Sequence, residues 1–174
     1  CIRDRYYVFF TLLFVGLIAA QEVVYNETFE DHPIGTELTK FKGLKFQGWN
    51  KSQWLVAEAE GNKFGKSTDQ KKAFLIKSFE LDAGSTYRWT LDLKAISKGT
   101  SWKRNHVITV TAKDGDGNYK YGTKTIKEPK SGTWISNAIE FTVLEGKTTV
   151  TLQIFRFADG CITAVDNYKL IKQE

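Results

Sequence analysis

The chain has 174 residues, of which 41% are hydrophobic and 14% aromatic, and its formal net charge is +5. This length suits one ordinary domain, and the apolar content excludes an intrinsically disordered chain. The 2 cysteines, Cys1 and Cys161, are too few for a disulfide-bonded scaffold or a cysteine zinc site.

The segment 1–20 is interpreted as an export signal rather than as part of the folded domain. Basic residues precede the apolar run 6–20, which is shorter than the roughly 20 residues that a helix needs to cross a bilayer. Small residues before Gln21 are typical of a signal-peptidase site. We therefore expect a signal-peptide helix and a mature domain at 21–174, secreted or held at the cell surface; the alternative is an uncleaved membrane anchor. A chain without Met is also expected to be part of a longer reading frame.

The mature chain alternates apolar and polar residues in short runs, which is typical of β-strands, and no stretch shows a convincing helical period. Gly, Asp, Asn and Ser separate these runs. The strands predicted in chain order are 23–29, 44–49, 53–59, 73–81, 86–96, 107–113, 120–126, 139–144, 148–157 and 162–171. We expect an all-β domain in which two antiparallel sheets pack as a β-sandwich.

The predicted strand 86–96 shows the period of two most clearly. One face is expected to be buried and the opposite face available to solvent or a ligand. The expected core face carries Tyr87, Trp89, Leu91, Leu93 and Ala95, and the opposite face carries Arg88, Thr90, Asp92 and Lys94.

Two hairpins are expected among the later strands. One joins the strands on either side of 114–118, and the other joins those on either side of 145–147. The first turn, Asp-Gly-Asp-Gly-Asn, resembles the start of a calcium loop. The positions that should hold Gly and Glu in such a loop hold Tyr119 and Thr125. We therefore interpret it as a hairpin turn.

The common catalytic and metal-binding patterns are absent from the sequence. His32 and His106 have no metal-ligand spacing with each other or with Cys161, and there is no Gly-Xaa-Ser-Xaa-Gly motif. The lysines are mixed with acids along the chain, and no nucleic-acid-binding motif occurs. We expect neither an enzyme nor a nucleic-acid partner.

Trp49 and Trp102 are the tryptophans expected in exposed loops, whereas Trp54, Trp89 and Trp134 are expected in the interior. Trp102 begins the run Trp-Lys-Arg-Asn-His. An aromatic ring and the guanidinium of Arg104 on one loop can stack on a sugar ring and pair with its carboxylate or sulfate. The alternative is an ordinary polar loop with Trp102 partly buried.

Three short motifs follow one another along the chain. They are Asn-Glu-Thr-Phe-Glu at 26–30, Leu-Asp-Ala-Gly-Ser-Thr-Tyr at 81–87, and a final group at 132–170 with Gly-Thr-Trp, Glu-Phe-Thr and Asp-Asn-Tyr-Lys-Leu. In this order they resemble the jelly-roll carbohydrate-binding modules of the galactose-binding-like group. The resemblance spans nearly all of 22–172 and implies a jelly-roll fold.

The resemblance also implies a structural Ca²⁺ site that ties the two ends of the domain together. The acid after the first-strand Phe and the acid of the final strand correspond to Glu30 and Asp166, with carbonyl donors expected near 65–69. Ca²⁺ accepts such mixed oxygen ligands. Glu27 stands where the family has Gly, and it is an alternative ligand. Without a metal, Glu30 is a surface acid and Asp166 caps a turn.

Polysaccharide is the ligand that the resemblance implies, bound either across a concave sheet or at the loops of one end. The sheet site would use Arg88, Asp92 and Gln153, together with Thr90, Thr109 and Phe155. The loop site would use Trp49, Trp102 and Arg104. The basic charge balance, together with Arg88 and Arg104, favours an acidic glycan.

We expect a monomeric, non-catalytic module that holds an attached or companion carbohydrate-active enzyme near its substrate. No membrane partner is expected once the signal is cleaved. Two other classes remain open. One is a small jelly-roll polysaccharide lyase or hydrolase, and the other is a surface adhesion or assembly domain without a sugar ligand.

Overall fold

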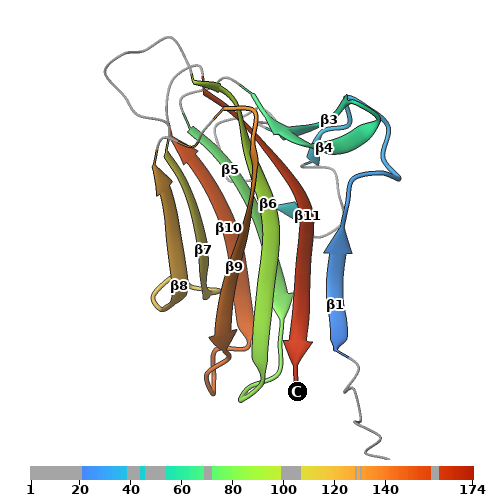
Figure 1. Ribbon diagram of the computed structural model, residues 1–174. Helices are drawn as coiled ribbons and strands as arrows, with labels where there is room; N and C mark the ends of the chain where they lie inside the picture. Colours follow the sequence, from blue (N-terminus) through green and yellow to red (C-terminus); the bar gives the residue numbers. More distant parts are fainter. Residues whose placement is uncertain are drawn as a thin grey trace, which may run out of the picture.

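The computed structural model describes residues 21–38, 44–45, 54–68, 72–98, 107–127, 129, 131–157 and 161–174. These residues form two antiparallel sheets that lie one behind the other (Figure 1). The six-stranded sheet contains β1 (Glu22–Glu27), β3 (Trp54–Ala59), β4 (Asn62–Ser67), β6 (Thr86–Lys98), β9 (Trp134–Thr142) and β11 (Cys161–Gln173). The five-stranded sheet contains β2 (Leu44–Lys45), β5 (Lys72–Glu80), β7 (Val107–Asp114), β8 (Lys120–Lys127) and β10 (Thr149–Phe157).

Strand order places the two longest strands at the centre of the six-stranded sheet. The order is β3-β4-β11-β6-β9, with β1 paired to β11, and the five-stranded order is β2-β5-β10-β7-β8. Side chains that alternate inward from both sheets form one core. On β6 the inward residues are buried as predicted: Tyr87, Trp89, Leu91, Leu93 and Ala95. The all-β sandwich predicted from the period-two pattern is therefore confirmed.

Strand β4 is one that the sequence analysis misses. Its residues, Asn-Lys-Phe-Gly-Lys-Ser, have no regular apolar alternation, and the ladders to β3 and β11 hold it in place. Glu60 and Gly61 form its turn with positive φ angles of 56° and 79°, as in a tight hairpin turn. Gly65 is needed for close packing, because a Cβ there would lie 2.9 Å from Val165 Cγ1 and 3.0 Å from Leu38 Cδ1.

The hairpin predicted across 145–147 is wrong, whereas the one across 114–118 is confirmed as β7–β8. β9 pairs with β6 in one sheet, and β10 pairs with β5 and β7 in the other. The connection between them crosses the edge of the sandwich, with Val143 buried in the core and its N–H donating to the Ser85 carbonyl at 3.0 Å. Turn-forming residues such as those at 145–147 occur both in hairpins and in connections between two sheets, so the sequence could not distinguish the two.

In the described part of the chain, no helix has the length and hydropathy required to cross a membrane. The predicted signal-peptide helix at 1–20 lies outside the described residues.

Candidate functional site

The predicted sheet-site residues divide between two outer faces that point in opposite directions. Arg88 and Asp92 lie on β6 of the six-stranded sheet, opposite in direction to the buried Trp89 and Leu91. Gln153 lies on β10 of the five-stranded sheet. The expectation that one concave face unites them is therefore wrong. Strands of both sheets show the same period of two, which does not reveal to which sheet a strand belongs.

Aromatic side chains gather at one end of the outer face of the five-stranded sheet. Phe74 of β5 and Phe155 of β10 are direct partners in the strand register, and their rings stack with centroids 4.6 Å apart. The Phe157 ring follows at 6.1 Å from that of Phe155. All three stay partly exposed, whereas Leu75 and Ile154, the sequence neighbours of Phe74 and Phe155, point into the core. The result is an apolar strip on a sheet surface.

Hydroxyl side chains continue this outer face beyond the aromatic strip. Cross-strand hydroxyl pairs join β5 to β10 and β7 to β8, and they are Ser78 with Thr151 (3.1 Å), Thr123 with Thr111 (3.3 Å) and Thr109 with Thr125 (3.4 Å). Gln153 stands among them, half-buried, with Ile76 and Thr111 as its register partners. This face therefore places hydrogen-bonding groups directly beside aromatic rings.

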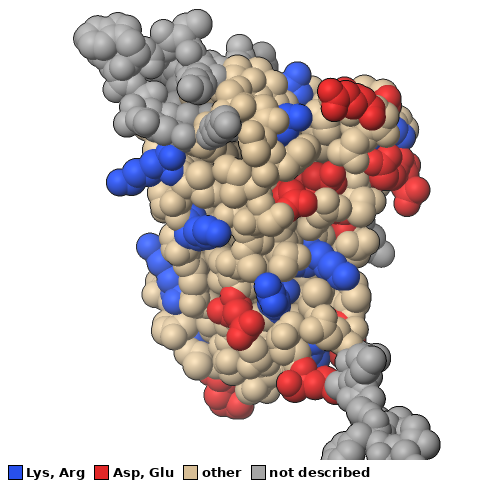
Figure 2. Space-filling model, viewed as in Figure 1, with Lys and Arg blue, Asp and Glu red and all other residues tan. Residues whose placement is uncertain are grey.

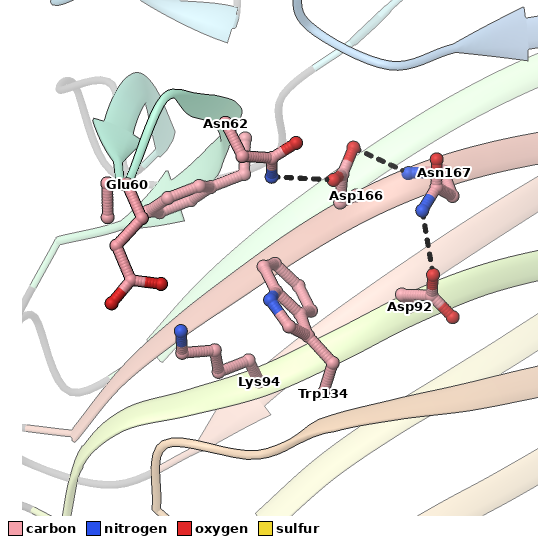
Figure 3. Close-up of a pocket in the computed structure, with 9 residues that line it drawn as sticks. Glu60, Asn62, Asp92, Lys94, Trp134, Asp166 and Asn167 are labelled. Atoms are coloured by element: carbon pink, nitrogen blue, oxygen red, sulfur yellow. Dashed lines mark hydrogen bonds between the residues drawn. The ribbon is translucent and has the colours of Figure 1, made fainter.

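The outer face of the six-stranded sheet carries a polar hollow of about 340 Å³ (Figure 3). The Trp134 indole forms part of its wall, with the Phe64 ring edge-on at 5.8 Å and the Lys94 ammonium 5.4 Å from the indole centroid. Trp134 was expected in the interior, but it is only half-buried. Asn62 Nδ2 donates to Asp166 Oδ2 at 3.0 Å across the same hollow.

A second hollow of about 540 Å³ adjoins the first and shares Asp92 and Asn167 with it. Its wall includes Arg88, Lys124 and Ser136, whose hydroxyl donates to Asp92. We call the two hollows together the Asp92 groove.

Burial raises the pKa of the Asp166 carboxyl above its ordinary value, and the nearby charges of Asp92 and Glu30 act in the same direction. Hydrogen bonds from the Asn62 amide and from the Asn167 backbone N–H act against this rise in pKa. The raised pKa of Asp166 therefore reflects mainly the burial of its carboxyl, and the two neighbouring acids add to the rise.

The predicted calcium ligands, Glu30 and Asp166, already accept hydrogen bonds from protein N–H groups. Lys63 donates its backbone N–H to Glu30 Oε1 at 3.0 Å and its ammonium to the Glu30 carbonyl oxygen at 2.7 Å. The segment 65–67, expected to supply carbonyls, lies in β4 between β3 and β11. Among the described residues there is no group of three or more His, Cys, Asp or Glu placed to hold a metal. A calcium ion at these two acids would have to compete with Lys63, and this site stays a prediction.

The alternative calcium ligand, Glu27, is occupied in a turn. Its Oε1 accepts the backbone N–H of Phe29 at 2.7 Å, and its Oε2 lies 3.3 Å from His32 Nε2. Phe29 has a positive φ of 65°, so this carboxylate stabilises an uncommon backbone conformation.

The predicted loop site of Trp49, Trp102 and Arg104 lies outside the described residues and stays a prediction. Sequence reasoning did not single out Phe74, Phe157, Asn62 or Asn167 as site residues. Phenylalanines in a strand indicate a core, and only the register shows that Phe74 lies beside Phe155 on an outer face.

Neither a family model nor a curated protein sequence matches the chain. Solved structures do match it. The CBM22-1 xylan-binding domain of Xyn10C from Paenibacillus barcinonensis superposes with a TM-score of 0.63 at 15% identity, covering 88% of this chain and 96% of that one. A family 61 module in complex with β-1,4-galactotriose gives a TM-score of 0.58 at 17% identity, covering 84% and 99%.

A third similar structure contains a catalytic module as well. It is the CBM22-1–GH10 portion of xylanase 10B from Clostridium thermocellum with xylohexaose, at a TM-score of 0.56 and 15% identity, covering 87% of this chain and 29% of that one. At such identities the shared property is the fold. This chain therefore has the jelly-roll β-sandwich fold of carbohydrate-binding modules, as the sequence motifs predict.

Proposed function

We propose that this domain binds polysaccharide without cleaving it, on the outer face of its five-stranded sheet. The observation that carries the proposal is the stacked pair Phe74–Phe155 beside Gln153 and the threonine hydroxyls. An aromatic face packs against the C–H face of a pyranose ring, while amides and hydroxyls donate to and accept from sugar hydroxyls. Similarity of fold to domains solved with xylohexaose and galactotriose supports this ligand class.

An acidic glycan suits the charges on this face. Lys113 pairs in register with Thr151, and Lys127 pairs with Val107, which in turn pairs with Phe157. Both lysines therefore stand at strand positions beside the hydroxyl and aromatic rows. The preference no longer rests on Arg88, because that guanidinium is on the opposite sheet.

The domain acts as an exported targeting module in this proposal. An open sheet surface leaves much of a bound sugar hydrated, so the affinity of one site is modest. Attachment to, or association with, a carbohydrate-active enzyme then raises the effective concentration of that enzyme at its substrate. The xylanase whose binding domain shares this fold together with a GH10 module supports such an arrangement.

The proposal is tested by isothermal titration against neutral xylan and galactan, a polyuronate and a sulfated glycan. Phe155→Ala should weaken binding by about fivefold, since an aromatic contact is worth about 1 kcal/mol. Gln153→Ala should also weaken it, and Thr142→Ala, at the far end of the other sheet, should match wild type. Wild-type affinity in both Phe155→Ala and Gln153→Ala would rule out this face as the binding site. Release of new reducing ends would show an enzyme instead, and a protein partner with no glycan binding would show an adhesion domain.

A further inference from the structure

The Asp92 groove lies on the face that the proposed function does not use. Its two hollows, about 340 Å³ and 540 Å³, lie within the range typical of small-ligand sites. They meet at Asp92 and Asn167, so a chain of linked units can run from one to the other across β11, β6 and β9.

A β-bulge in β11 builds the centre of the groove. Asp166 pairs with Asp92, but the next partners are Lys169 and Thr90, so β11 contains one extra residue at this point. Asn167 takes a left-handed φ of 49° there. Consecutive side chains of a regular strand point to opposite faces, yet Asp166 and Asn167 both line the groove, and Tyr168 returns to the core. Bulges often re-aim side chains at binding sites.

The groups in the groove both donate and accept hydrogen bonds. Asn167 Nδ2 donates to Asp92 Oδ2 at 2.8 Å, and Asn62 donates to Asp166 (Figure 3). A carboxylate has about four acceptor positions and an amide carbonyl about two, so these groups keep acceptor capacity after their mutual bonds are made. The Lys94 ammonium supplies further donors at the Trp134 wall.

The charges around the groove have both signs. Figure 2 shows acidic and basic side chains interspersed over the face that carries β6, β9 and β11, with acids gathered beside β3 and β4. The groove itself combines Glu60, Asp92 and Asp166 with Arg88, Lys94 and Lys124. A strongly charged ligand of either sign would meet repulsion along part of this surface. Hydroxyl groups, which donate and accept, match it throughout.

We propose that the Asp92 groove is a second glycan-binding site, specific for neutral pyranose units, with Trp134 as the apolar wall. The proposal takes its ligand class from the proposed function, but it concerns different residues on the opposite face. Because the two faces point apart, one stretch of polysaccharide cannot occupy both. The domain is then bivalent and joins two glycan chains.

The test is an NMR titration of backbone amides with a panel of neutral oligosaccharides that includes xylohexaose and β-1,4-galactotriose. We expect shifts in β6, β9 and β11 that persist when Phe155→Ala and Gln153→Ala remove the first site. Asn167→Gly, which tolerates the left-handed φ, should reduce groove affinity at least fivefold, and Asp92→Ser should do the same. Thr142→Ala serves as the matched exposed control on the same sheet.

The outcomes separate the two proposals. Shifts confined to the five-stranded sheet would overturn the groove and leave the first site intact. Shifts confined to the groove would support it, and the first site would then be judged by the titration against the polyuronate and the sulfated glycan. No shift with any member of the panel would overturn the groove. Co-precipitation of soluble neutral xylan with a soluble polyuronate by wild type, lost in both Phe155→Ala and Asn167→Gly, would support bivalency.

Discussion

The Asn167 amide donates to the Asp92 carboxylate at 2.8 Å, joining β11 to β6 beside the bulge where their register shifts. The bond holds Asn167 in a left-handed conformation that non-glycine residues rarely adopt. Asn is among the residues that tolerate this conformation best, and its side chain is the one that bridges to Asp92. The bulge and the groove therefore depend on the same residue.

The left-handed φ at Asn167 predicts an order of stability for substitutions there. Asn167→Val should lower the free energy of unfolding by about 1–3 kcal/mol, because a β-branched residue is strained at positive φ. Asn167→Gly should change it by much less, since glycine accepts this conformation. Urea denaturation measures both. Lys169→Val, two residues on in the regular strand, is the control and should be close to neutral; an equal loss at both positions would argue against the strained bulge.

The fold is far more predictable from this sequence than the site. Strand β6 could be predicted correctly because apolar and polar residues alternate strictly around Trp89. The Asp-Asn pair at 166–167 could be placed in the final strand because it belongs to the last of the three motifs that carry the family resemblance. The sequence could not show which strands share a sheet, because Gln153 and Asp92 both lie in strands with the same period-two alternation. Strand β4 was missed because backbone ladders, rather than apolar side chains, define it.

Close packing at Gly65 makes a second prediction. Gly65→Ala should destabilise the domain by about 1–3 kcal/mol, the usual cost of overpacking a tight core, because its Cβ would lie 2.9 Å from Val165 Cγ1. The double variant Gly65→Ala, Val165→Ala should lose less stability than the sum of the losses in the two single variants, because the clashing methyl group of Val165 is gone. Chemical denaturation of the four proteins of this cycle gives the coupling. Strict additivity would show that the Val165 contact is not the cause.

Two buried aspartates should titrate on opposite sides of the ordinary pKa of 3.8. Hydrogen bonding to the Lys147 ammonium, at 2.7 Å, lowers the pKa of Asp114. Its contribution to stability is therefore complete above pH 3.8 and is lost as the pH falls through the lower folded-state value. Burial raises the pKa of Asp166, so its ionised form disfavours the folded state at neutral pH, and stability is regained as the pH falls through the raised value.

Side-chain carboxyl ¹³C titration by NMR measures both aspartates directly. Lys147→Met should raise the titration midpoint of Asp114, because it removes the ammonium that bonds this carboxylate. The midpoint of Asp166 should stay unchanged, because Lys147 is not among the groups that act on it. A common midpoint near 3.8 for both carboxyls in wild type would contradict the two environments described here.

The predicted calcium site can be tested through its competitor. The Lys63 ammonium lies 2.7 Å from the Glu30 carbonyl oxygen, where it supplies a positive charge beside the predicted ligands. A calcium ion at Glu30 and Asp166 would be repelled by this nearby ammonium, so removing the ammonium should strengthen binding. We expect calcium to raise the Tm of Lys63→Met more than that of wild type, and EDTA to reverse both shifts.

Glu30→Gln and Asp166→Asn provide the specific controls for that measurement, because each removes one predicted anionic ligand while keeping the side-chain shape. Either substitution should abolish the calcium-dependent rise in Tm in the Lys63→Met background. A Tm that neither calcium nor EDTA moves, in wild type and in Lys63→Met alike, would contradict the predicted calcium site.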